Sequence, residues 1–128
     1  MECYTVLKIS LHKIITVKNS DVDKAKRFLI ADLIDYIPKA VVMKTILYKS
    51  TGNVTAISFD SGQYLPENVS PFDTLIQIIE GRAEILINDN LLMLETGESI
   101  IVPAHSKSSI TANKRLKMIS TVIKSGYE

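Results

Sequence analysis

The side chains that could transfer protons in this sequence centre on His105, one of its 2 histidines. An imidazole titrates near neutral pH, so His105 could act as a general acid or base if a partner oriented it. Glu67 and Asp73 are carboxylates that could orient it, and Tyr64 or Tyr48 could serve as an acid. Because no spacing in the sequence joins these residues into a defined pair, a solvated histidine in a turn is the alternative interpretation.

The other reactive side chains favour structural interpretations. His12 stands beside Lys13 in a stretch with strand character, where a structural or surface role is the simpler hypothesis. Cys3 has no neighbour in the sequence that would favour its thiolate. As the single cysteine it cannot form an intrachain disulfide, which fits a reducing compartment, so we expect the cytoplasm. Charged residues interrupt the N-terminal stretch, and the sequence predicts neither a signal peptide nor a membrane span.

Composition limits the classes of partner. The chain has 128 residues, 46% of them apolar, which suffices for one structural domain with a continuous core. Its 15 Lys and Arg residues nearly balance its 14 Asp and Glu residues, so no net field would recruit nucleic acid or an anionic membrane. Tryptophan is absent and aromatic residues make up 6% of the chain, which argues against a platform for stacking bases or sugars.

The elements that must position these side chains begin with a strand region and a helix. Thr5 to Val17 alternate apolar and polar residues and predict one or two strands. In the following stretch, 19–39, Ser20 can cap a helix, with Asp23 as a weak capping box, and Pro38 would end it. Apolar residues recur there at helical spacing, namely Val22, Ala25, Leu29 and Leu33.

After Pro38 the pattern changes to short apolar runs separated by turn residues, with a long loop predicted from Asp60 to Phe72. The runs are AVVMKTILY, VTAISF, TLIQIIE, AEILI, LLMLE, SIIVPA, SITA and LKMISTVIK. Short strands with tight punctuation and no helix between them predict an antiparallel barrel or sandwich. A parallel α/β fold would need crossover helices that are lacking here.

From about Asp32 onward, the order of these runs and their turn glycines resembles the small single-domain cupins. The matching stretches are DLIDYIPKAVVMKTILYKSTGNVTAISFDSG, PFDTLIQIIEGRAEILIND and LETGESIIVPAHSKSSITANKRLKMISTVIK. The resemblance implies a mainly β fold, an antiparallel, jelly-roll-like barrel known as a double-stranded β-helix. We expect the barrel over residues 39–128, with residues 1–38 forming a strand and helix extension packed on it.

The resemblance also shows where a cupin would hold a metal. The first family motif, G-x5-H-x-H-x3-4-E-x6-G, fits between Gly62 and Gly81 and places its ligands at Asn68, Ser70 and Thr74. The second motif, G-x5-P-x-G-x2-H, fits Gly97 and Pro103, with its second glycine at His105 and its histidine at Ser108. All four ligands are replaced by amide or hydroxyl groups, which bind Fe, Mn, Ni or Zn poorly. We therefore expect no metal and no cofactor.

Three hypotheses for function remain open. Asn68, Ser70, Thr74 and Ser108 could line a pocket for a neutral or weakly polar small molecule, with His105, Glu67 and Asp73 at its rim; the same side chains could also merely satisfy one another. A metal-independent acid/base enzyme, similar to an isomerase or epimerase, is the second hypothesis, and a non-catalytic dimeric scaffold is the third. Small cupins are commonly homodimers, so the resemblance implies a homodimer under each hypothesis.

Overall fold

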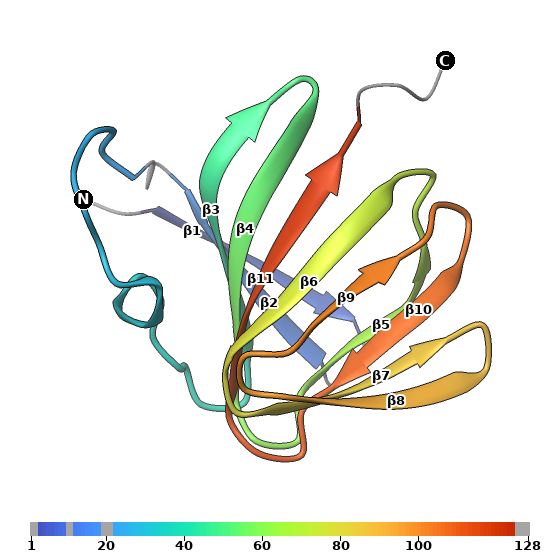
Figure 1. Ribbon diagram of the computed structural model, residues 1–128. Helices are drawn as coiled ribbons and strands as arrows, with labels where there is room; N and C mark the ends of the chain where they lie inside the picture. Colours follow the sequence, from blue (N-terminus) through green and yellow to red (C-terminus); the bar gives the residue numbers. More distant parts are fainter. Residues whose placement is uncertain (1–2, 10–11, 19–21, 125–128) are drawn as a thin grey trace.

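The computed structural model describes residues 3–9, 12–18 and 22–124, and its strands form two sheets (Figure 1). The seven-stranded sheet has the order β1 (Cys3–Ile9), β2 (His12–Lys18), β3 (Val41–Lys49), β4 (Gly52–Phe59), β11 (Leu116–Ile123), β6 (Asp73–Glu80) and β9 (Ser99–Val102). The four-stranded sheet has the order β5 (Tyr64–Val69), β10 (Lys107–Thr111), β7 (Arg82–Ile87) and β8 (Asn90–Glu95). All pairings are antiparallel except β2 with β3. The predicted mainly β barrel is confirmed.

The main core lies between the inner faces of the two sheets. Its largest fully buried side chains come from both sheets and include Phe59, Ile78, Ile85 and Leu116. In Figure 1 the strands converge toward the lower end, where the β6–β7 and β10–β11 turns lie, and spread apart toward the upper end. We call these the narrow end and the wide end of the barrel.

Gly81 makes the close packing at the narrow end possible. It has a left-handed backbone with φ of 96°, and a Cβ at this position would collide with the backbone carbonyl oxygen of Arg115. The β6–β7 turn therefore approaches the β10–β11 turn more closely than any other residue type would allow. Gly62 and Gly97, the remaining turn glycines of the two motifs, also have left-handed backbones.

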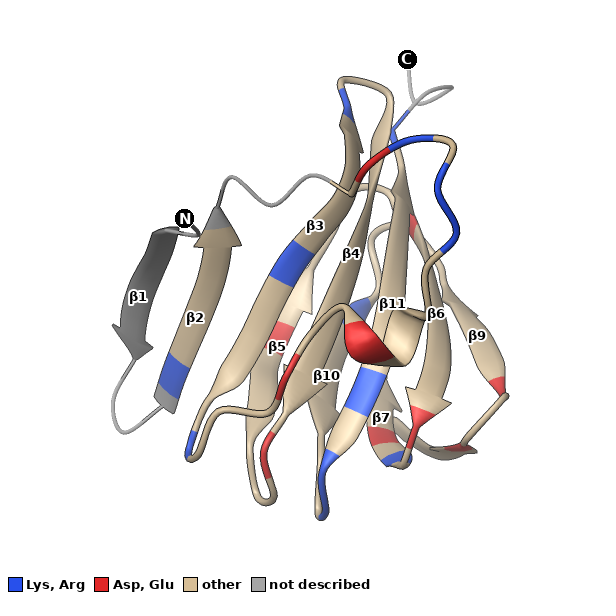
Figure 2. Ribbon diagram, turned by 90° about the vertical axis from the view of Figure 1, so that its left-hand side faces the viewer, with Lys and Arg blue, Asp and Glu red and all other residues tan. Residues whose placement is uncertain are grey.

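A second core covers the outer face of the seven-stranded sheet. Ile15, Val42, Ala56 and Ile119 point to this face and pack with Ile34 from the segment that precedes β3. Figure 2 shows this segment, with the short 3-10 helix η1 (Ile30–Asp32), crossing in front of the sheet. The pattern explains why several strands are apolar without alternation, since the sheet is covered on both faces.

The predicted N-terminal helix is wrong. Among residues 22–38 the one helical element is η1, and Ala25 has a left-handed φ of 61°; Ser20, the predicted cap, lies outside the described residues. Two carbonyl groups of this segment are bound by the sheet instead of by helical N–H groups. Lys117 Nζ donates to the Ala31 carbonyl at 2.6 Å, and Ser58 Oγ donates to the Asp35 carbonyl at 2.8 Å. Tertiary hydrogen bonds and apolar burial thus override the helical spacing.

The predicted loop from Asp60 to Phe72 is also wrong in its middle. Strand β5, Tyr64–Val69, lies within it and pairs antiparallel with β10. Pro66 lies within this strand and lacks a backbone N–H group, but β5 is the edge of its sheet, where proline is tolerated. The predicted strands on either side of this loop are confirmed.

The N-terminal strand prediction is confirmed. β1 and β2 form an antiparallel hairpin that extends the seven-stranded sheet at β3. Within the part of the chain that the structure describes, no helix is long and apolar enough to cross a membrane.

Candidate functional site

The cavity of the barrel arises from a change of side-chain size along its inward-facing rows. On β11 the inward residues run from Leu116 and Met118, which are buried, to Ser120 and Val122, which are partly exposed. Since alternate residues of a strand point to the same face, this row passes from filled core to open space. The opening lies toward the wide end of the barrel.

A cavity of about 430 Å³ occupies this space. Its floor is formed by apolar side chains of both sheets, among them Met43, Ile57, Ile76, Ile110 and Met118. Its polar lining consists of Glu67, Asn68, Ser70, Thr74, Ser106, Ser108, Ser109 and Ser120. An apolar floor with several hydrogen-bonding groups is typical of a small-molecule site.

All four residues at the predicted ligand positions line this cavity. Asn68 on β5 and Ser108 on β10 are register partners in the four-stranded sheet. Thr74 lies at the start of β6 in the other sheet, paired with Val122 of β11. Ser70 stands in the connection from β5 to β6, and its Oγ accepts a hydrogen bond of 3.1 Å from the backbone N–H of Phe72. The two sheets thus bring these residues to one place.

Comparison with known proteins identifies the architecture. No family model and no curated protein matches the sequence. A conserved protein of unknown function from Streptococcus pyogenes superposes with a TM-score of 0.77 at 24% identity, over 81% of this chain and 91% of that one. A cupin superfamily protein from Desulfitobacterium hafniense gives a TM-score of 0.76 at 24% identity, over 80% and 94%. This chain has the cupin fold.

The similarity in fold extends to a predicted enzyme. A predicted oxalate decarboxylase from Thermotoga maritima has a TM-score of 0.62 at 14% identity, covering 66% of this chain and 80% of that one. At these identities the likeness shows the fold alone. The chemistry of this protein must therefore be argued from its own cavity.

The donors at the four cupin ligand positions are one amide and three hydroxyl groups. They do not fit Fe, Mn, Ni or Zn, which need imidazole, thiolate or carboxylate donors to replace water. Glu67 is the single carboxylate among the lining residues in the described part of the chain. No group of three His, Cys, Asp or Glu side chains in the described ranges could hold a metal ion.

His105 lies outside the cavity lining. Its side chain is exposed, and its backbone N–H donates to the Ser70 carbonyl oxygen at 2.7 Å. Its φ of 68° is left-handed, which explains why the cupin motif has glycine at this position. His105 here completes a turn, and that geometry does not support the acid/base hypothesis.

Of the other residues considered for the rim, one lines the cavity and the rest do not. Glu67 lines the cavity, whereas Asp73 Oδ1 accepts a hydrogen bond of 2.8 Å from the backbone N–H of Ala104 and so fastens the same turn. Tyr48 and Tyr64 are exposed and do not belong to the lining.

Sequence reasoning missed Ser106, Ser109 and Ser120 as lining residues. Ser120 had a visible signal, because a serine follows Leu116 and Met118 in the inward row of a strand that is otherwise apolar on that face. Ser106 is buried and precedes β10, a position that no motif marks.

Proposed function

We propose that this protein binds a small organic molecule in its barrel cavity and holds no tightly bound metal ion there. The observation that carries the proposal is the cavity of about 430 Å³, which lies within the range of small-molecule sites and is lined by neutral residues at all four cupin ligand positions. Neutral hydroxyl and amide groups donate and accept hydrogen bonds but do not replace the water of a divalent cation.

Binding is favoured over catalysis by the placement of the titratable groups. The histidine that could transfer protons lies outside the cavity, and Glu67 is the single titratable side chain in the described lining. An acid/base reaction needs a group within hydrogen-bond reach of the substrate, and proton abstraction and return commonly use two.

The metal part of the proposal is tested by mass spectrometric metal analysis of protein purified without a tag or chelator. We expect less than about a tenth of an equivalent of transition metal per chain. Near one equivalent would contradict this part and would return metal-dependent chemistry to first place.

The ligand part is tested by native mass spectrometry of the freshly purified protein and by thermal unfolding with a metabolite panel. A bound molecule stabilises the folded state by RT ln(1 + [L]/Kd), about 2.7 kcal/mol at a hundredfold excess over Kd. A retained organic mass, or a reproducible rise in Tm with one chemical class, supports binding. A protein without either, across a broad panel, would contradict it.

We further propose a homodimer in the cytoplasm. β1 and β2 extend the seven-stranded sheet beyond β3, and the segment that covers this sheet exposes Phe28, Leu29 and Ile30, with Leu29 at 71% exposure. In the ribbon of Figure 2, positions of Lys and Arg and positions of Asp and Glu both occur along the turns and the covering segment. This distribution supports a protein partner over nucleic acid or a membrane. A monomeric mass in light scattering at micromolar concentration would contradict the dimer.

A further inference from the structure

The wide end of the barrel carries a cation that the cavity lining lacks. Lys124 follows β11 and lies two residues beyond Val122, which lines the cavity. Alternation along the strand places Lys124 on the same inward face, about 7 Å further toward the opening. Lys124 is not one of the lining residues, and this position puts its ammonium group just beyond them, toward the wide end.

Two aromatic rings lie on either side of this lysine. Lys124 Nζ lies 5.9 Å from the centre of the Tyr48 ring and 5.8 Å from the centre of the Phe72 ring. Tyr48 comes from β3, on one side of β11, and Phe72 directly precedes β6, on the other side. The rings attract the cation through their faces without taking up its hydrogen-bond donors. The lysine side chain thus loses less freedom when it meets an anion.

The positions of the charged groups indicate how a ligand would be oriented in the cavity. Glu67 is on β5, in the four-stranded sheet, whereas Lys124 continues β11 of the seven-stranded sheet. No ion pair joins Lys124 to a carboxylate in the described part of the chain. Below the mouth, the floor is apolar and several hydroxyl groups face it. An anionic group would meet its complement at the mouth, and an apolar body would meet the floor.

From this arrangement we infer that the ligand is a small organic carboxylate, whose apolar body fills the cavity and whose carboxylate binds the ammonium group of Lys124. This inference rests on the proposed function and adds the chemical class of the ligand. Tyr48 and Phe72 act as positioning residues for Lys124.

The test compares matched acids and alcohols. Phenylacetate, 4-hydroxyphenylacetate and decanoate are titrated by calorimetry beside 2-phenylethanol, 4-hydroxyphenylethanol and 1-decanol, which differ from them at the head group. At least one acid should bind about tenfold more tightly than its alcohol, the gain expected from a charge-assisted hydrogen bond. Lys124→Gln should abolish this preference, and Lys124→Arg should retain it.

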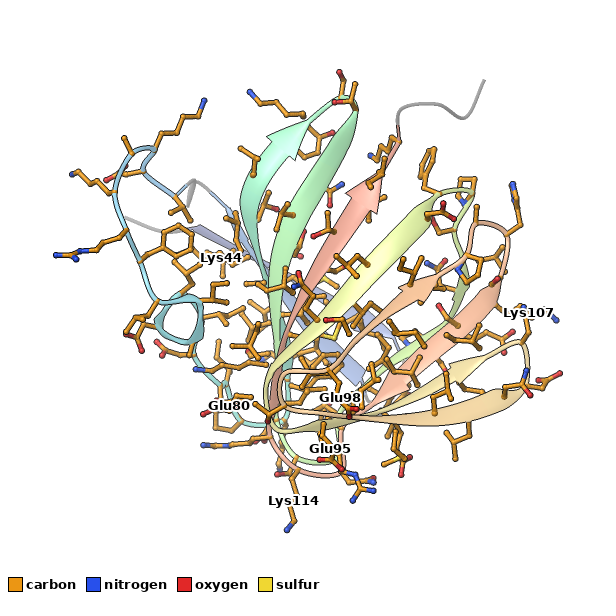
Figure 3. The ribbon with its side chains drawn as sticks, in the orientation of Figure 1. Lys44, Glu80, Glu95, Glu98, Lys107 and Lys114 are labelled. Carbon is orange, nitrogen blue, oxygen red and sulfur yellow. The ribbon has the colours of Figure 1, made fainter. Side chains whose placement is uncertain are left out.

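Lys114 provides the matched control. It lies at the narrow end in Figure 3, in the β10–β11 turn, so Lys114→Gln removes the same charge far from the cavity mouth and should leave the acid preference unchanged. Glu67→Gln should strengthen acid binding several-fold, because it removes a like charge from the lining. Thermal unfolding of each variant confirms that it folds.

The outcomes separate the inference from the proposed function. If acids and alcohols bind equally, or if Lys124→Gln keeps the preference, the inference is overturned while small-molecule binding stands. If no member of the series binds up to about 10 mM, the inference is overturned. The metabolite panel then decides the proposed function independently.

Discussion

The two ends of the barrel are built from the same strands and differ in what those strands point inward. At the narrow end, Phe59, Ile78 and Leu116 fill the space between the sheets and are fully buried. At the wide end, the corresponding strands β6 and β11 point Thr74 and Ser120 inward, and the cavity begins. The cavity therefore arises because the inward-facing side chains of the same strands become smaller toward the wide end.

The difference also divides stability from function. Backbone hydrogen bonds join the turns of the narrow end, such as Gly62 to Ala112 at 2.8 Å and Gly97 to Ile78 at 2.9 Å. Close packing and hydrogen bonds in the turns stabilise this end. At the wide end the residues around the cavity lack these packing contacts, and the open space is available to a ligand. Substitutions at the two ends should consequently affect different measurements.

The largest expected effect is on the core of the narrow end. Phe59→Ala should lower the free energy of unfolding by about 3–5 kcal/mol, because it leaves a cavity at a fully buried position. Thr55→Ala, on the same strand toward the wide end, should cost less than about 1 kcal/mol. Urea unfolding measures both. Phe59→Leu replaces the alanine variant if that one does not fold, and equal costs at the two positions would contradict the division between the ends.

Filling the cavity at the wide end should affect ligand binding more than it affects the free energy of unfolding. Ser120→Leu places a larger apolar side chain in the cavity and should weaken binding of the tightest-binding acid of the series at least about tenfold, while the free energy of unfolding changes by less than about 1.5 kcal/mol. Ser120→Ala is the matched control, since it removes the same hydroxyl without filling space. Loss of binding in both variants would show that the hydroxyl, and not the volume, matters.

These two ends also show how far the sequence alone could lead. Alternating and apolar runs bounded by glycine predicted most strands, because burial on one or both faces leaves a direct pattern. The helix failed for a physical reason: Ala31 and Asp35 carbonyl groups bind Lys117 and Ser58, which are distant in sequence. β5 was missed because Pro66 is permitted only by the position of that strand at a sheet edge, which is a property of the assembled sheet.

The sequence predicted residues of the site only through the glycines of the turns that flank them. Motif glycines fixed the register that places Asn68, Ser70 and Thr74, and the structure brings these residues to one cavity. The cation at the mouth left no such signal, since Lys124 meets Tyr48 and Phe72 through strands far apart in the chain.

A smaller effect is expected from the outside of the narrow end. Tyr36 OH donates to Glu80 Oε2 at 2.6 Å, and Arg115 and Lys117 each lie 4.9 Å from the centre of the Tyr36 ring. This cluster fastens the covering segment over the narrow end. Tyr36→Phe should lower the free energy of unfolding by about 1 kcal/mol at pH 8, measured by urea unfolding. An unchanged free energy would show that the hydrogen bond from Tyr36 to Glu80 does not help to hold the segment, and that apolar packing and the hydrogen bonds from Lys117 and Ser58 suffice.

The contribution of Tyr36 to the free energy of unfolding should depend on pH. Burial, and then the hydrogen bond to Glu80, raise the pKa of Tyr36 above its ordinary value. Below about pH 10 the phenol is neutral in both the folded and the unfolded state, so its contribution is fully present. Above that pH the unfolded state loses its proton first, and the contribution decreases. The difference between wild type and Tyr36→Phe should therefore shrink between pH 8 and pH 11, and a constant difference would contradict the assignment.

The smallest expected effect concerns the turn at the wide end. His105 adopts a φ of 68°, a conformation that costs a residue with a side chain more than it costs glycine. His105→Gly should raise the free energy of unfolding by up to about 1 kcal/mol, because relief of strain exceeds the greater flexibility of glycine in the unfolded chain. His105→Ala removes the imidazole and keeps the strain, so it should not stabilise the protein. Both variants should bind the tightest-binding acid of the series as wild type does, because the imidazole does not line the cavity. If both weaken binding equally, the imidazole itself contacts the ligand, and the wide end would contain the acid/base group that its geometry now places outside.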